Sequence, residues 1–260
     1  MTAKAALFLV LPTLASAQAV LTAWTHSEDP GSGMLAREIA FARKDRLRDA
    51  VATLHAIAKT EKISPDSASQ SITVEGNARE ASLAEWLIGE LDNPSPSQFG
   101  HGYIMPQDQD DVTLVVGDVH LGGPGRAATP QDLRELVNAI HVLGDIPRAA
   151  VYSPADLLVW RGKVWQNDFA LWLLQELASP LGANWTAPIP HHLDQALPSV
   201  RVFYFAPETS VQDLGQILST IRAKAPVQRV VAINAKRAIV LRGTEIQAAA
   251  AERIAAAARH

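Results

Sequence analysis

Three short stretches that each end in glycine set the pattern of this chain. They are Ser71-Ile72-Thr73-Val74-Glu75-Gly76, Leu157-Leu158-Val159-Trp160-Arg161-Gly162 and Ala238-Ile239-Val240-Leu241-Arg242-Gly243. Each is a run of strand-forming residues followed by helix-forming sequence, so each glycine marks a predicted junction from strand to helix. The matching sequence on both sides of these glycines predicts one structural unit that occurs three times.

A helix is predicted after each glycine, because apolar residues recur at the same distances from it. Positions seven, eight and eleven after the glycine are Leu83, Ala84 and Leu87, then Phe169, Ala170 and Leu173, then Ala250, Ala251 and Ile254. The first two copies also share Trp86 and Trp172 at position ten and Glu90 and Glu176 at position fourteen. We interpret the tryptophans as packing residues and the glutamates as residues on the solvent side of a helix.

A second helix is predicted before each glycine. Its apolar residues are Leu47, Ala50, Val51 and Leu54, then Leu133, Leu136, Val137 and Ile140, then Leu214, Ile217, Leu218 and Ile221. This i, i+3, i+4, i+7 spacing is that of an amphipathic helix. Leu133 and Leu214 each follow Gln-Asp, with Pro and Ser or Thr a few residues earlier, as is typical of helix N-termini.

A β-hairpin is predicted between the two helices of each copy, clearest at residues 229–233 and 238–241. Residues 112–116 and 200–205 supply a leading strand for the second and third copies. The leading strand of the first copy is expected to be missing or to lie within residues 20–24. The chain is therefore predicted to be an α+β protein of three tandem βαββα modules, each a small sheet with two helices on one face, with the first copy degenerate.

Proline, glycine and polar residues divide the chain further. We expect a signal peptide over residues 1–17, an N-terminal segment over 18–40 and the degenerate first copy over 41–93. A linker over 94–111 precedes the second copy at 112–180. A proline-rich linker over 181–198 precedes the third copy at 199–260.

The composition excludes several classes of protein. The chain has 260 residues, 48% of them hydrophobic, so it can bury a core and is not disordered. The absence of cysteine excludes disulfides, thiolate metal sites and a cysteine nucleophile. A net charge of −4 argues against nucleic acid as a partner.

The first residues resemble a secretory signal peptide. Lys4 gives a positive start, residues 5–14 are apolar, and Ala15-Ser16-Ala17 has the small-x-small pattern of a cleavage site. We expect cleavage after Ala17 and a periplasmic or secreted product without an integral membrane span. An uncleaved anchor is the alternative, although ten apolar residues are short for a bilayer.

Residues 151–162 and 230–243, with the helices that follow them, resemble the ring-building N-domains of bacterial secretins, including the related short N-terminal domain of TonB-dependent receptors. The resemblance rests on the hydrophobic pattern and on a strand ending in Val/Leu-x-Arg-Gly, and it covers most of the mature chain. It implies periplasmic modules that pack side by side into rings and carry no catalytic residues. The last predicted helix is followed directly by His260, so the secretin pore domain is expected to be absent.

Candidate metal ligands lie only in predicted loops. Asp118, His120, His191 and His192 could bind zinc, and Asp108, Asp110 and Asp111 a hard cation such as calcium. Neither set has the spacing of His-Glu-x-x-His or of a glycine-containing calcium loop, so we interpret both as exposed polar linkers. Gly-x-Ser-x-Gly and the phosphate-binding Gly-x4-Gly-Lys-Ser/Thr are absent. We therefore assign no catalytic, cofactor-binding or metal residue.

The preferred hypothesis is a non-enzymatic exported scaffold or accessory protein that uses its modules to bind envelope proteins and further copies of itself. Gly76, Gly162, Gly243, Trp86, Trp172, Leu133 and Leu214 would anchor the modules, and Trp185, Phe203 and Phe205 would be candidate partner contacts. Replacing Gly162 with a bulky residue should destabilise the strand-to-helix junction if this position needs a positive φ. The alternatives are a periplasmic metal-dependent enzyme using Asp118, His120, His191 and His192, and a binder of small ligands or peptidoglycan between the modules.

Overall fold

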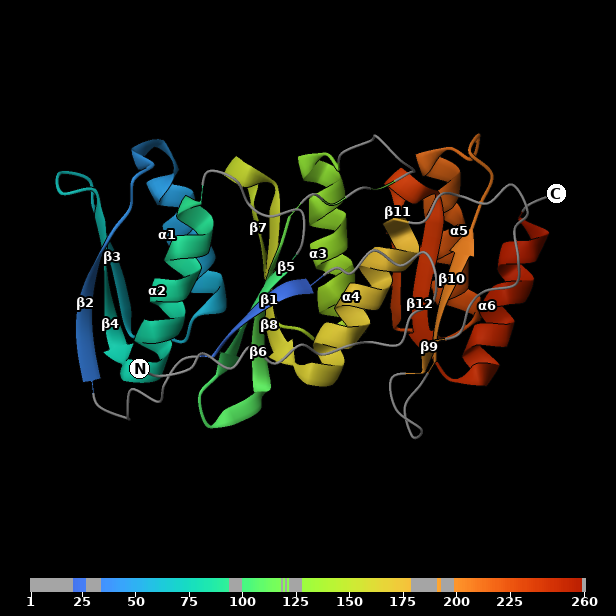
Figure 1. The fold of residues 1–260 in the computed structure, drawn as a ribbon. Helices are drawn as coiled ribbons and strands as arrows, with labels where there is room; N and C mark the ends of the chain where they lie inside the picture. Colours follow the sequence, from blue (N-terminus) through green and yellow to red (C-terminus); the bar gives the residue numbers. More distant parts are fainter. Residues whose placement is uncertain are drawn as a thin grey trace. The chain divides into compact units, whose positions relative to one another are not determined.

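The computed structural model describes residues 21–26, 34–93, 100–117, 119, 121, 128–178, 191–192 and 199–258. These residues form six α-helices and three small sheets (Figure 1). The predicted α+β class with βαββα modules is confirmed. Within the described part of the chain, no helix combines the length and apolar character needed to cross a membrane.

The first module is an antiparallel three-stranded sheet, in the order β2-β4-β3, with two helices. Its elements are β2 (Met34–Ala40), α1 (Leu47–Ile57), β3 (Lys62–Asp66), β4 (Ser71–Asn77) and α2 (Ala78–Asp92). The leading strand is thus β2, within the predicted N-terminal segment, and not residues 20–24. Pro65 lies in the edge strand β3, where its missing N–H costs no ladder hydrogen bond.

The second module has a five-stranded sheet in the order β1-β5-β6-β8-β7. Its elements are β5 (Gly100–Met105), β6 (Asp108–Val116), α3 (Pro130–Gly144), β7 (Arg148–Tyr152), β8 (Leu157–Lys163) and α4 (Val164–Ala178). The predicted linker at 94–111 therefore contains much of a β-hairpin, β5–β6. β1 (Leu21–His26) joins this sheet, parallel to β5.

The third module has a four-stranded sheet in the order β11-β12-β10-β9. Its elements are β9 (His191–His192), β10 (Ser199–Tyr204), α5 (Val211–Lys224), β11 (Arg229–Ile233), β12 (Ala238–Gly243) and α6 (Glu245–Ala257). α5 and α6 pack on one face of the sheet around a buried cluster that includes Phe203, Leu214 and Leu241.

The three modules share one topology and one register. The leading strand always pairs with the second hairpin strand, as in β2-β4-β3, β6-β8-β7 and β10-β12-β11. Positions below are counted from the junction glycine, so that −1 is the residue before it. Position −14 pairs with −1 across every hairpin, as Lys62 with Glu75, Arg148 with Arg161 and Arg229 with Arg242.

The hairpin turns are also equivalent. Position −6 has a positive φ in each module: 55° at Gln70, 50° at Asp156 and 48° at Arg237. Thr129 and Ser210, both at position −33, accept the backbone N–H of the residue three further on and so cap α3 and α5. The predicted N-termini of these helices are therefore correct.

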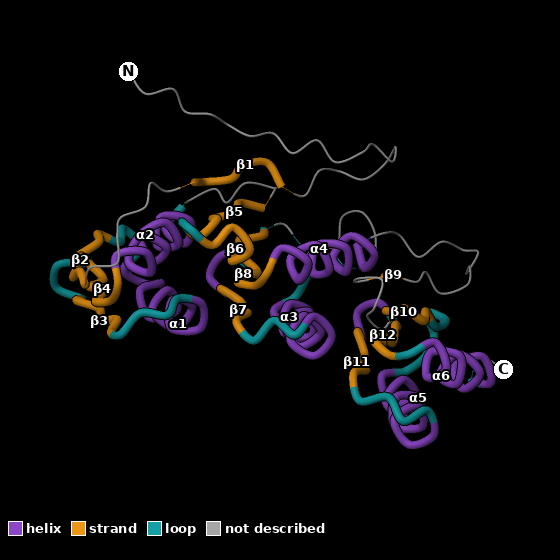
Figure 2. The backbone as a smooth tube through the Cα atoms, turned by 90° about the horizontal axis from the view of Figure 1, so that it is seen from below, coloured by secondary structure: helices purple, strands orange, loops and turns teal. Residues whose placement is uncertain are grey.

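The chain divides into two compact units, and the division falls inside the second module. One unit comprises residues 1–118 and 148–167, and the other 119–147 and 168–260. In the first unit, α1 and α2 lie between the sheet β2-β4-β3 and the sheet of the second module (Figure 2). In the second unit, the sheet β11-β12-β10 lies between α3 and the pair α5/α6 (Figure 2).

Candidate protein-interaction surfaces

The described residues contain two joints, in each of which helices of one module contact the sheet of the next. In the first joint, α1 contacts β7 and α2 contacts β5. In the second joint, α3 contacts β11 and β12. Each joint lies within one compact unit, so its contacts can be compared position by position.

The first joint has a hydrophobic core. Tyr152, Leu157 and Val159 from the sheet of the second module belong to one buried cluster with Ile57 of α1 and Leu87 of α2. All five side chains are at most 1% exposed. Burial of this much apolar surface makes the hydrophobic effect the main attraction at the joint.

Arginine at position −1 anchors both joints. In the first joint, the Arg161 guanidinium donates to Glu80 at 2.7 and 2.9 Å and to Asp111 at 2.6 and 2.8 Å. In the second joint, Arg242 donates to the backbone oxygen of Leu143 at 2.8 Å and to Asp145 at 2.9 Å. Glu80, Leu143 and Asp145 all belong to the preceding module.

A second arginine, at position −14, contacts the end of the first helix of the preceding module. Arg148 donates to the backbone oxygen of Ile57, the last residue of α1, at 3.0 Å. Arg229 bonds to Asp145, which directly follows α3. Two like charges opposite each other in a hairpin are unfavourable by themselves. These acceptors offset the repulsion within both arginine pairs.

Glutamate at position +14 contributes from the helix side. The Glu90 carboxylate lies 2.7 Å from Nδ1 of His101 in β5. The Tyr204 hydroxyl donates to the Glu176 carboxylate at 2.9 Å. Their interpretation as solvent-side residues is therefore wrong, because each contacts the next module. The third copy, which no described module follows, has Ala257 at this position.

The electrostatic environment of these groups reflects their burial. Burial lowers the pKa of Arg161, but the hydrogen bonds and charges of Asp111 and Glu80 raise it by more. The pKa of Arg161 is therefore above its ordinary value. Burial, followed by the Glu176 charge and hydrogen bond, raises the pKa of Tyr204. Burial also lowers the pKa of Lys236, against the opposing effect of Glu176.

The first module presents a different sheet face. Six alternating hairpin positions, −14, −12, −10, −5, −3 and −1, form the face away from its own helices. They are Lys62, Ser64, Asp66, Ser71, Thr73 and Glu75 in the first module, Arg148, Ala150, Tyr152, Leu157, Val159 and Arg161 in the second, and Arg229, Val231, Ile233, Ala238, Val240 and Arg242 in the third. The first set is polar throughout, and its Lys62 and Glu75 form a 2.6 Å ion pair.

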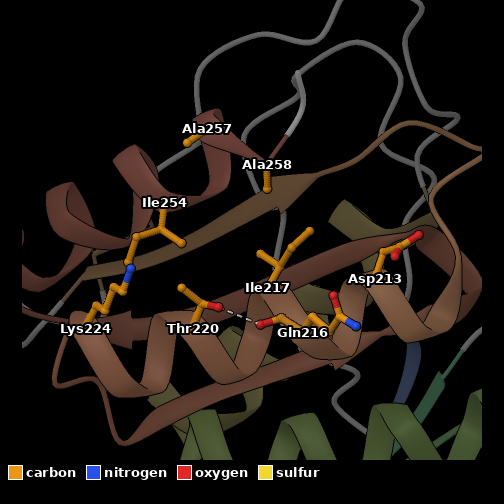
Figure 3. A pocket seen from close by; sticks show the side chains of 8 residues that line it. All are labelled: Asp213, Gln216, Ile217, Thr220, Lys224, Ile254, Ala257 and Ala258. Carbon is orange, nitrogen blue, oxygen red and sulfur yellow. Dashed lines mark hydrogen bonds between the residues drawn. The ribbon is translucent and has the colours of Figure 1, made fainter.

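The outer side of the last helix pair forms a shallow groove (Figure 3). It is lined by Asp213, Gln216, Ile217, Thr220 and Lys224 of α5 and by Ile254, Ala257 and Ala258 at the end of α6. The groove is mostly polar along α5 and apolar along α6. Lys224, Ala257 and Ala258 are exposed. The counterparts of Lys224 and Ala257 in the first two modules, Ile57, Leu143, Glu90 and Glu176, contribute to the joints.

The predicted anchor residues lie within the modules. Leu133 and Leu214 are fully buried in α3 and α5. The Trp86 ring contacts Tyr103 of β5, with ring centroids 5.4 Å apart, and so packs at the first joint. Trp172 contacts Phe169 at 6.0 Å within α4.

The three junction glycines do not have a positive φ, so the reason suggested for Gly162 is wrong. The role of Gly162 and Gly243 is steric. A Cβ at Gly162 would lie 2.9 Å from Oε1 of Gln166, and one at Gly243 would lie 2.8 Å from Oε1 of Gln247. Both glutamine oxygens accept a backbone N–H at the start of the following helix, at 2.8 and 2.9 Å.

Phe203 and Phe205 do not lie on the surface, in contrast to their prediction as partner contacts. Phe203 and Phe205 are 0% and 5% exposed, because both rings belong to the core between the sheet and α5/α6. Neither ring is available to a partner in this structure. Trp185 lies outside the described residues.

The candidate metal ligands are only partly described. Asp118 and His120 lie outside the described residues, and the backbone of His191 and His192 forms β9. Of the aspartates, Asp111 binds Arg161, and Asp110 accepts the Val164 N–H at 3.2 Å. A group of three or more potential metal ligands does not occur among the described residues.

No family model and no curated protein matches the chain. Among solved structures, ExeD of Aeromonas hydrophila matches at 13% identity and a TM-score of 0.21, covering 87% of this chain and 41% of ExeD. The N-terminal domain of the secretin XcpQ from Pseudomonas aeruginosa matches at 11% identity and a TM-score of 0.24, covering 56% of this chain and 62% of that one. The a/eIF2alpha-aDim2p-rRNA complex from Pyrococcus horikoshii matches at 16% identity and a TM-score of 0.30, covering 58% of this chain and 89% of the matched chain.

An N-terminal domain of a secretin is thus among the matched structures. The chain spans less than two thirds of ExeD and of the XcpQ domain. All three TM-scores are below 0.5, so the matches establish neither a shared family nor a shared function.

Proposed function

We propose that this chain is a non-enzymatic, exported scaffold or accessory protein of the bacterial envelope. It binds other proteins through its βαββα modules, as part of a secretion, pilus or uptake machine. Its partners are proteins, including further copies of itself, and not nucleic acid. It needs no cofactor, and it works in the periplasm after removal of residues 1–17.

One observation carries this proposal: charged residues recur at the positions where one module meets the next. Arg161 and Arg242 on the sheets, and Glu90 and Glu176 on the helices, all contact a neighbouring module. An enzyme instead directs its recurring charged groups towards one cleft, where a substrate can reach them. The arrangement favours a chain whose chemistry is the recognition of one module by another.

Export and protein binding can be tested in one experiment. A photo-reactive amino acid is placed at exposed Ala257, at the end of α6, and in a matched control at exposed Ala52 of α1. After expression in a Gram-negative bacterium, we expect a periplasmic product that begins at Gln18. Irradiation should give covalent protein adducts from position 257 and few from position 52.

Two outcomes would contradict the proposal. An unprocessed chain in the cytoplasm would refute export. A periplasmic chain that remains free of protein adducts at both positions, and that hydrolyses a substrate only with added zinc, would favour the metal-dependent enzyme.

A further inference from the structure

Two faces of the chain correspond to joint surfaces but form no joint among the described residues. One is the polar face of the sheet β2-β4-β3, which carries Lys62 and Glu75. The other is the outer side of α5 and α6, which carries Lys224 (Figure 3). Both differ from the inner joints at the positions that carry charge.

On the helix side, the difference is clearest at position −19. This position is Ile57 in the first module and Leu143 in the second, and both are fully buried. In the third module it is Lys224, which is exposed. Position −19 is therefore apolar and buried in the two modules whose helices form the inner joints, and an exposed cation in the third.

On the sheet side, the corresponding difference is at position −1. The inner joints have Arg161 and Arg242 there, whereas the free sheet has Glu75. The free sheet therefore has an anion where the inner joints have a cation. The anion Glu75 on the free sheet is thus complementary to the cation Lys224 on the free helix pair.

Each inner joint brings one of these two sheet positions to position −19 at the end of the preceding module's first helix: −1 in the second joint and −14 in the first. Arg242 at position −1 bonds to the backbone oxygen of Leu143 at position −19, at 2.8 Å. Arg148 at position −14 bonds to the backbone oxygen of Ile57 at −19, at 3.0 Å. If the two free faces met in the same way, Glu75 would lie beside the Lys224 ammonium and Lys62 beside the end of α5. The first contact pairs opposite charges. The second places a cation at a helix C-terminus, where the helix dipole stabilises it.

We propose that the occupant of the α5/α6 groove is a second copy of this chain, bound head to tail through its β2-β4-β3 sheet. This inference rests on the proposed function, since it names one partner of the same joint surfaces. The contact uses different faces on the two copies, so each added copy leaves the same two faces open for another. Because the contact is polar and carries exposed charges, it is weaker than the inner joints and is weakened by salt.

Charge-reversal variants test this pairing. The mature chain is followed by sedimentation velocity from micromolar to near-millimolar concentration, at low and high salt. We expect reversible association of the wild type at low salt. E75K and K224E should each shift association to at least about tenfold higher concentration. An equimolar mixture of E75K and K224E should regain association, because Glu faces Lys at both kinds of contact when the two variants alternate. The double variant E75K/K224E should regain association by itself, because its Lys and Glu are exchanged.

The controls separate loss of the contact from loss of the fold. Arg48→Glu reverses the charge of an exposed residue of α1, a helix that belongs to neither face, and should leave association unchanged. Melting temperatures should stay close to that of the wild type, because Lys62, Glu75 and Lys224 are all substantially exposed. A wild type that remains monomeric at the highest concentration, or two single variants that fail to rescue each other, would overturn the proposal.

The photo-crosslinking experiment distinguishes this failure from failure of the proposed function. Adducts from Ala257 that consist only of a different envelope protein would refute self-association but support the assembly role. Mass spectrometry of the adducts identifies Lys62, Glu75 or their neighbours as the crosslinked segment if the proposal is correct.

Discussion

The two joints have arginine at the same positions but stabilise it in different ways. In the first joint, Arg161 is 3% exposed and faces Glu80, whose side chain is 7% exposed, and Asp111. In the second joint, Arg242 is 5% exposed, but its acceptors are a backbone oxygen and Asp145, whose side chain is 44% exposed. The hairpin register determines where the cation lies, and the preceding module determines how its charge is neutralised. We therefore expect equivalent substitutions to have unequal effects.

The largest effect is expected for Arg161→Ala. The substitution leaves the buried Glu80 and the partly buried Asp111 without their cation, which typically costs about 3–5 kcal/mol. Urea unfolding followed by tryptophan fluorescence measures the change in the free energy of unfolding. The control is the neutral triple variant R161M/E80Q/D111N, which should recover much of the loss. A loss below about 1 kcal/mol for Arg161→Ala would show that the cluster does not hold the joint.

Arg242→Ala should have a smaller effect, about 1–3 kcal/mol. Asp145 is partly exposed and can be hydrated, so the cost is mainly the unpaired oxygen of Leu143 and lost packing. The same urea titration applies, with Arg229→Ala as a matched control at a more exposed position. If Arg242→Ala were as destabilising as Arg161→Ala, the contrast between the two joints would be wrong.

The tyrosines of the two joints should also respond differently. The Tyr204 hydroxyl donates to Glu176, so Tyr204→Phe should cost about 1 kcal/mol. The Tyr152 hydroxyl is buried and has no hydrogen-bond partner among the described residues. Tyr152→Phe should therefore leave the stability at neutral pH unchanged or slightly higher. Thermal unfolding at pH 7 compares the two variants, and an equal loss for both would contradict this assignment.

Alkaline pH extends the tyrosine comparison. Burial raises the pKa of Tyr152 to about 12, whereas an unfolded tyrosine ionises near 10. Between these values the unfolded state releases its proton first, so the contribution of Tyr152 to stability is complete below pH 10 and falls as the pH rises towards 12. Thermal unfolding of Tyr152→Phe should show a shallower fall over this interval than the wild type. Identical slopes would indicate that Tyr152 is accessible to water.

The smallest effect concerns the junction glycines. Gly162→Ala and Gly243→Ala should each destabilise by about 0.5–1 kcal/mol, because the new Cβ crowds the capping glutamine. At Gly76 the nearest atom to a new Cβ is Cα of Thr60 at 3.4 Å, so Gly76→Ala should be close to neutral. Melting temperatures of the three variants test the order, and a larger loss for Gly76→Ala would reverse it.

The module pattern could be predicted from the sequence because it depends on local periodicity. The spacing around Gly162 and Gly243 identified hairpins, helices and their N-termini, since these follow from alternating or helical apolar positions. The strand β2 could not be predicted in the same way. Its sequence Met34–Ala40 is short and mixed in polarity, and it is a strand because it pairs with β4.

The joint residues left a signal in the sequence that was open to another interpretation. Glutamate recurs at position +14 in the two copies that precede another module, and arginine at −1 in the two copies that follow one. Spacing along a helix cannot distinguish a glutamate that contacts solvent from one that contacts a second module, because both lie off the module's own core.

The amino-acid sequence by itself therefore determined the modules, their order and the approximate ends of their helices, since neighbouring residues decide these features. The tertiary structure decided which face of each module is covered, that Arg161 and Arg242 are joint residues, and that Phe203 is core. These depend on the contacts of residues up to about a hundred positions apart, such as Arg242 with Leu143. Apolar and charged side chains acquire their roles from the surface that packs against them, and only the folded chain brings that surface into contact.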